Sequence, residues 1–110
     1  MFWLPLIGLA LLAAVAAITI KVLIDKAREY LRKKKEDIRK KGIRIVEIKV
    51  KDILEKEGKK VVKIGLIGKR KTLIPFRRKV DLGELAVQGD KLEDDIKKDQ
   101  ILEILTPEDI

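Results

Sequence analysis

Residues 1–20 read MFWLPLIGLALLAAVAAITI, and the first charged side chain of the protein is Lys21. Twenty residues of α-helix extend about 30 Å, the thickness of the hydrocarbon core of a bilayer. Pro5 lies near the start, where a proline costs a helix little, and Trp3 is placed as an interfacial aromatic residue would be. The segment predicts a transmembrane helix that anchors the rest of the chain.

A cleaved signal peptide is the main alternative for this segment. Signal peptides begin with a basic region and carry an apolar run of roughly 7–15 residues. Here no Lys or Arg precedes the run, and the run is longer. Ala14-Val15-Ala16 fits a cleavage pattern, but alanine-rich helices produce that pattern by chance. We therefore expect a retained, single-pass span.

Small residues recur at helical spacing within the predicted span. Ala10 and Ala14 are separated by one turn of helix, and so are Ala13 and Ala17. Such pairs let two helices approach closely in a membrane. They are our candidate residues for membrane packing, against another protein or another copy of the chain.

A basic helical stalk is expected over residues 21–42. Residues 21–41 hold ten basic and four acidic side chains, and the positive-inside rule then places the C-terminal domain in the cytoplasm. Ile24, Leu31 and Ile38 recur every seven residues, which makes them candidate interface residues. Gly42 is suited to end the helix.

Residues 43–110 predict a small β-rich soluble domain, so the expected class is α+β. Apolar residues alternate with polar ones around Val46–Val50 and Val62–Leu66, and a last strand is expected at Ile101–Leu105. Glu57-Gly58-Lys59 and Gly89-Asp90 are predicted turns. About five short strands in a sheet or partly open barrel are expected. The competing interpretation makes residues 82–98 helical.

The composition limits the chemistry that the chain can perform. Cys, His, Ser and Asn are all absent, which excludes disulfides, thiolate or histidine metal sites and the usual acyl-transfer triads. Gly65-Leu66-Ile67-Gly68-Lys69 has neither the spacing nor the Ser or Thr of a P-loop. The acidic run from Asp90 to Asp99 lacks the spacing of a calcium loop. We therefore predict no enzyme, no catalytic or metal-binding residues and no cofactor.

The overall residue usage is typical of hyperthermophile proteins. Charged residues make up 40% of the chain, and thermolabile Asn and Cys are missing. An engineered sequence can share this bias.

A basic cluster marks the predicted hairpin tip and the strand that returns from it. It is followed by residues 80–110, where ten acidic side chains stand against three basic ones. A stalk of about 30 Å would hold the cluster beyond the reach of lipid charge, so we expect it to meet acidic residues of the same chain or a neighbouring copy. Its members are the interface candidates Lys69, Arg70, Lys71, Arg77, Arg78 and Lys79.

These features together predict a membrane-anchored, non-enzymatic interaction protein, an accessory or assembly subunit of a larger membrane-associated complex. Its expected partners are the lipid bilayer and other subunits or copies of itself. Two alternatives stay open. The net charge of +8 is compatible with a membrane-tethered nucleic-acid-binding protein, which is not favoured because Phe76 is the one aromatic in the basic cluster. The short, alanine-rich chain is also compatible with a small holin-like or toxin-like protein.

Overall fold

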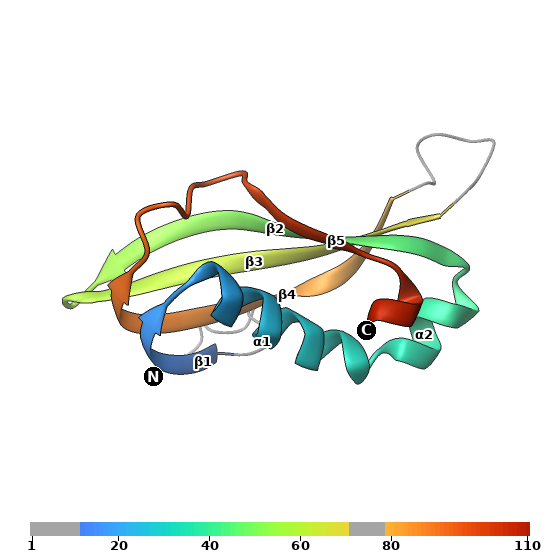
Figure 1. Cartoon of the computed structure of the whole chain (residues 1–110), viewed down its shortest axis with the longest axis horizontal. Coiled ribbons are helices and arrows are strands. Elements are labelled where there is room, and N and C mark those ends of the chain that lie inside the picture. Colours follow the sequence, from blue (N-terminus) through green and yellow to red (C-terminus); the bar gives the residue numbers. More distant parts are fainter. Residues whose placement is uncertain (1–11, 71–78) are drawn as a thin grey trace, which may run out of the picture.

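The computed structural model describes residues 12–70 and 79–110. Within these ranges a mixed β-sheet is covered on one face by a helix (Figure 1). The elements, in chain order, are β1 (Leu12–Ile18), α1 (Ile20–Arg32), α2 (Lys35–Lys40), β2 (Ile43–Lys56), β3 (Lys59–Arg70), β4 (Lys79–Leu92), β5 (Ile101–Leu105) and the 3₁₀ turn η3 (Pro107–Asp109).

The five strands lie in the order β1-β4-β3-β2-β5. β2, β3 and β4 form an antiparallel meander, and β5 pairs antiparallel with β2 at one edge. β1 pairs with β4 at the other edge and is the one parallel strand among them. A small β-rich sheet domain is therefore confirmed. One of its strands comes from residues 12–18, however, and not from the 43–110 segment to which we assigned all five.

The alternation predicted for the two central strands is confirmed by their burial. Val46, Ile48 and Val50 of β2 are fully buried, as are the β3 residues that pair close to them, Ile64 and Leu66. Register shifts occur between Ile43 and Ile45 and between Val50 and Asp52. The first lies where the apolar residues change phase, from Ile43 and Ile45 to Val46, Ile48 and Val50.

The predicted turn at Glu57-Gly58 is confirmed as the two-residue connection between β2 and β3. Lys56 pairs with Lys59, and Glu57 and Gly58 have φ values of 53° and 79°. Positive φ at both central residues is the geometry that fits the twist of a hairpin, and glycine adopts it without steric cost. The predicted end of the helical region at Gly42 is also confirmed, since α2 ends at Lys40.

The second half of the uncharged segment differs from the expected transmembrane helix. Residues 12–18 form strand β1, whose register runs from Leu12 opposite Ala86 to Ile18 opposite Leu92. Ile18 is fully buried, so burial in the sheet here outweighs the helical preference of the alanines. Residues 1–11 lie outside the described residues. In the part of the chain that the structure describes, no helix is both long and apolar enough to cross a bilayer.

The helix after Thr19 packs on the sheet and does not project as a stalk. Leu23, Ala27 and Leu31 of α1 are completely buried. Fully burying a leucine side chain stabilises a fold by roughly 1.5–3 kcal/mol, so one amphipathic face holds the helix down. Lys33 and Lys34 interrupt the expected continuous helix and separate α1 from α2.

The start of α1 is fixed by two side chains that are far apart in sequence. Thr19 accepts a hydrogen bond from the Val22 amide at 3.1 Å, and the Glu93 carboxylate accepts one from the Ile20 amide at 2.8 Å. The Glu93 amide in turn donates to the Ile18 carbonyl at 2.9 Å. The loop after β4 therefore ties the β1–α1 junction to the rest of the domain.

The helical interpretation of residues 82–98 is wrong, because β4 continues to Leu92 and irregular loop follows. The predicted turn at Gly89-Asp90 is also wrong, since both residues lie inside β4. Opposite Gly89 lies Val15 of β1, and a Cβ at Gly89 would meet Ile18 at 2.8 Å. This glycine makes room for a neighbouring strand instead of a turn.

Candidate functional site

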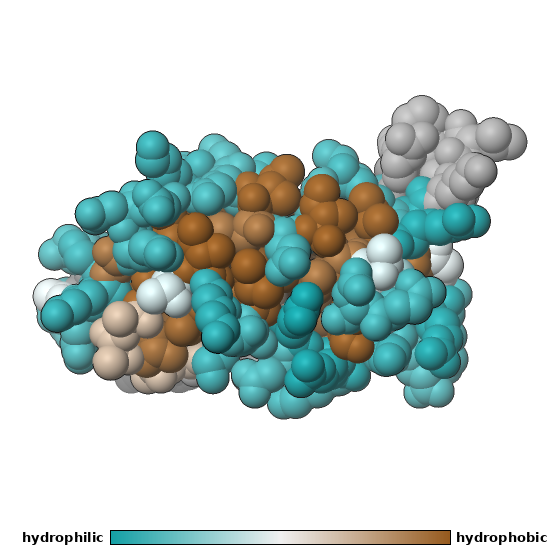
Figure 2. All heavy atoms as spheres, viewed as in Figure 1, coloured by the Kyte–Doolittle hydropathy of each residue, from teal (hydrophilic) through white to brown (hydrophobic). Residues whose placement is uncertain are grey.

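Two of the exposed large hydrophobic side chains among the described residues lie on β5, and the third, Leu54, lies five positions beyond the β2 partner of Ile101. Ile101 and Ile104 of β5 are 49% and 53% exposed, and Leu54 of the neighbouring strand β2 is 40% exposed. In Figure 2, hydrophobic atoms lie along β5 and in the band between β5 and α1. Exposed apolar side chains that cluster at one place are typical of binding surfaces.

The register shows that both isoleucines point away from the helix. Ile104 is opposite Glu47 and Ile101 is opposite Lys49, whereas Leu105 is opposite the fully buried Val46. Cross-strand partners share a face of the sheet. Ile101 and Ile104 are three residues apart, so in an uninterrupted strand they would lie on opposite faces. The register shift between Ile101 and Glu103 brings both side chains to the same face. We call Ile101 and Ile104 the β5 edge patch.

The one charged residue of β5 is turned toward the helix. The Glu103 carboxylate lies 3.9 Å from a guanidinium nitrogen of Arg28 in α1. The Nε of Arg28 is buried and has no hydrogen-bond partner. With its only charge directed inward, β5 presents an apolar outer edge.

The end of β5 is followed by a compact acidic turn. Asp109 accepts hydrogen bonds from the backbone N–H and the hydroxyl of Thr106, at 3.1 and 2.9 Å. These bonds, the backbone one first, hold the pKa of the Asp109 carboxyl below its usual value of 3.8, and the charge of Arg28 acts in the same direction. The carboxylate of Asp109 is therefore charged at neutral pH.

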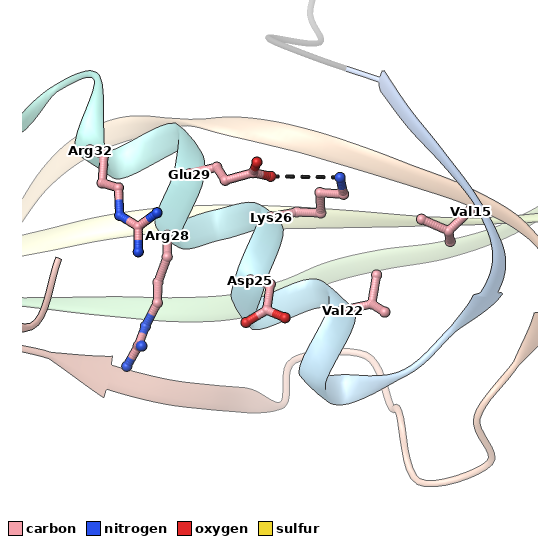
Figure 3. A pocket seen from close by; sticks show the side chains of 7 residues that line it. All are labelled: Val15, Val22, Asp25, Lys26, Arg28, Glu29 and Arg32. Carbon is pink, nitrogen blue, oxygen red and sulfur yellow. Dashed lines mark ion pairs between the residues drawn. The ribbon is translucent and has the colours of Figure 1, made fainter.

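A second feature is a hollow of about 530 Å³ between β1 and α1 (Figure 3). Val15 and Val22 form its apolar walls. Its rim carries charges of both signs, and Lys26 pairs with Glu29 at 3.6 Å, while Arg28 points toward β5. The described lining holds three basic and two acidic side chains, and no polar group in it is directed at a common point where a ligand would bind. The charged lining residues are Asp25, Lys26, Arg28, Glu29 and Arg32.

Three of the alanines predicted to pack helices, Ala13, Ala14 and Ala17, lie on the edge strand β1. Ala13 is half-buried, and Ala14 and Ala17 are exposed. Ala10 lies outside the described residues. Their one-turn spacing has no meaning in a strand, where successive side chains alternate between faces.

The residues that recur every seven positions, Ile24, Leu31 and Ile38, pack inside the domain. Leu31 and Ile38 are fully buried, and Ile24 packs against the same core. The stripe therefore contacts the core of the chain's own domain, and its role at an interface with another protein stays a prediction.

The basic cluster is described in part. Lys69 pairs with Glu47 of β2 at 2.9 Å and Lys79 is exposed, while Arg70, at the end of β3, is half-buried. Lys71, Arg77 and Arg78 lie outside the described residues. The acid that Lys69 meets belongs to β2 and not to the C-terminal segment.

The acidic run between Asp90 and Asp99 is dispersed. Asp90 pairs with Lys59 at 2.7 Å, Glu93 caps α1, and Asp94 and Asp95 are exposed. Among the residues that the structure describes, no three acidic side chains converge as metal ligands would.

The β5 edge patch was not predicted from the sequence. The sequence predicts a strand at residues 101–105, but its place at the edge of the sheet follows from the strand order alone. The apolar run Ile101-Leu102, followed by Ile104-Leu105, was the available signal, since a strand exposed on one face usually alternates more strictly. No protein-family model, curated protein or solved structure matches this chain.

Proposed function

We propose that this chain is a non-enzymatic interaction protein, an accessory or assembly subunit of a membrane-associated complex, and that its sheet domain binds a partner at the β5 edge. The observation that carries this proposal is the β5 edge patch, where Ile101 and Ile104 are about half exposed on one face. The lack of Cys, His and Ser in the whole chain supports a role without catalysis.

Strand addition is the mode of binding that this geometry supports. An extended segment beside β5 would pair with its outward backbone groups, and its side chains would contact Ile101 and Ile104. In such complexes the backbone hydrogen bonds supply affinity and the side chains supply specificity. Lys or Pro on an edge strand protects against this pairing, and β5 contains neither.

Attachment to a membrane is the other part of the proposal. It is supported by the uncharged segment of residues 1–20 and by the basic residues that follow it. Eleven residues of helix extend about 17 Å, so residues 1–11 alone would be too short to cross a hydrocarbon core of about 30 Å. A helical span of residues 1–20 therefore requires β1 to leave β4. Residues 12–18 cannot belong to a membrane-spanning helix and pair with β4 at the same time.

The test is purification of the full chain from a membrane fraction in mild detergent, with Ile104→Lys as the variant. We expect a stoichiometric companion subunit with the parent protein and its loss with Ile104→Lys, together with protection of the 101–105 amides from hydrogen exchange when the companion is bound. Gln88→Lys is the matched control, because it adds the same charge on the same face of the sheet but on β4. Equal recovery of the companion with Ile104→Lys would refute the β5 edge as the binding surface.

A further inference from the structure

The outer edge of β5 is flanked by opposite charges at its two ends. Lys97 and Lys98 precede the strand, Glu108 and Asp109 follow it, and all four side chains are exposed. Lys98 and Glu108 are equally distant from Glu103 along the sequence. The strand therefore presents an apolar edge with a basic end and an acidic end.

We infer that the segment which binds beside β5 is β5 of a second copy, in antiparallel orientation. This inference rests on the proposed function, because it takes the β5 edge as a binding surface. Antiparallel pairing places the Lys97–Lys98 end of each copy against the Glu108–Asp109 end of the other, twice by symmetry. Parallel pairing would place like charges together, which is unfavourable.

The geometry of the two ends supports contact at both. At the basic end, the Asp99 amide donates to the Val50 carbonyl at 2.9 Å, which fixes the backbone next to Lys98 on β2. The loop's other exposed acids, Asp94 and Asp95, follow the end of β4 at Leu92 by two and three positions. At the acidic end, the hydrogen bonds from Thr106 fix the Asp109 carboxylate and keep it charged.

The apolar side chains gain a partner in the same arrangement. Ile101 and Ile104 lie on one face, so two antiparallel copies bring four isoleucines to the same face of the shared edge. Each Glu103 is directed toward its own Arg28 on the opposite face. The result is one sheet that continues through both copies, with the patch shared between them.

Engineered cysteines in the full chain test the orientation directly, because the natural sequence has no cysteine. Lys98→Cys and Glu108→Cys are made separately at these exposed positions. After oxidation and denaturing electrophoresis, we expect little dimer from either variant alone and a disulfide-linked dimer when the two are mixed before oxidation. Dimers from each variant alone, and none from the mixture, would show parallel pairing and overturn the inference.

Charge reversal tests the contact between the basic end of one copy and the acidic end of the other through the dimer dissociation constant. Lys98→Glu or Glu108→Lys alone should raise the dimer dissociation constant about three- to tenfold, since each variant loses two surface ion pairs and creates repulsion. The combination of both reversals restores opposite charges and should return the constant to the parent value. If the dissociation constant of the combined variant is raised by the effects of both single reversals together, the inference is overturned.

Ile104→Lys separates this inference from the proposed function. We expect its dimer to dissociate at least about tenfold more readily than that of Gln88→Lys, measured by sedimentation of the full chain in detergent. If the parent chain is monomeric and gives no cross-link but Ile104→Lys still loses its companion subunit, the self-pairing fails and the proposed function stands. If the companion is unaffected as well, both fail.

Discussion

Gly83 is the residue whose backbone and surroundings both exclude a larger side chain. Its φ is +116°, and a Cβ there would lie 2.3 Å from the Tyr30 hydroxyl. That hydroxyl donates to the Leu82 carbonyl at 3.3 Å. A register shift in the pairing of β3 and β4 falls at the same point, between Leu66 and Ile67. The glycine thus lets α1 sit close to β4 where the strand bulges.

We expect Gly83→Ala to lower the free energy of unfolding by roughly 1–3 kcal/mol, because the substitution adds backbone strain and a steric contact with Tyr30. Gly42→Ala is the control, since Gly42 also has a positive φ, +68°, but has no atom within 4 Å of the added Cβ. Urea denaturation measures both. A loss at Gly83 no larger than at Gly42 would show that Tyr30 moves aside without cost.

Asp109 gives a prediction about pH. The hydrogen bonds from Thr106 lower the pKa of its carboxyl below 3.8 in the folded chain. A group whose pKa is depressed by folding stabilises the fold above its unfolded pKa and loses that contribution as pH falls through the folded pKa. We therefore expect stability from this turn to decline below about pH 4.

An NMR titration of the Asp109 carboxyl carbon measures this pKa. Thr106→Val removes the hydroxyl donor and should move the pKa of Asp109 back toward 3.8, while the backbone donor keeps it from returning fully. An Asp109 carboxyl that titrates at the same pH in the parent and in Thr106→Val would contradict the assignment of the hydroxyl bond.

At the scale of elements, the start of α1 is the junction on which the arrangement depends. Thr19 supplies a local cap, and Glu93 supplies one from the loop after β4. The Thr19 cap is local to the helix, whereas Glu93 lies 73 residues from Ile20 in the sequence. A helix with a negative side chain at its N-terminus is also favoured by its dipole.

We expect Thr19→Ala to cost about 1 kcal/mol of stability, the usual value for a lost helix cap. Glu93→Ala should cost a comparable amount, and Glu93→Gln less, because the amide oxygen still accepts the hydrogen bond from Ile20 while the charge is lost. Hydrogen exchange of the Ile20 and Val22 amides distinguishes the two caps. Glu93→Ala should speed exchange at Ile20 first, and unchanged exchange there would show that the carboxylate is dispensable.

At the scale of the whole molecule, β1 is the element with two possible roles. It is the parallel edge strand of the sheet, and its residues also form the second half of the uncharged N-terminal segment. β2, β3, β4 and β5 pair with one another without it. Release of β1 would uncover the outer edge of β4 and one end of α1 while it leaves those four strands paired.

A disulfide between Ala14→Cys and Gln88→Cys, which are register partners, should hold β1 on β4. We expect the oxidised full chain to be released from vesicles by alkaline extraction and the reduced chain to be retained. A Val61→Cys and Gln88→Cys pair joins β3 to β4 and leaves β1 free, so it serves as the control. Retention of the oxidised Ala14–Gln88 form would show that attachment does not need residues 12–20.

Sequence alone determined those parts of the protein in which short-range pattern and burial agree. The alternation of Val46, Ile48 and Val50 and of Val62, Ile64 and Leu66, the turn at Glu57-Gly58 and the last strand at Ile101–Leu105 were all readable, because each is set by neighbouring residues. The missing Cys, His and Ser likewise limited the chemistry without any structure.

Tertiary structure alone decided the parts where local preference is ambiguous. An uncharged, alanine-rich run satisfies a membrane helix and an edge strand equally well, and pairing with β4 selects the strand at residues 12–18. The apolar stripe that includes Leu31 and Ile38 could pack on any apolar surface. In the structure it packs on the sheet of the same chain. Strand order, which places β5 at the edge and exposes Ile101 and Ile104, depends on contacts between residues distant in sequence, and no local pattern encodes it.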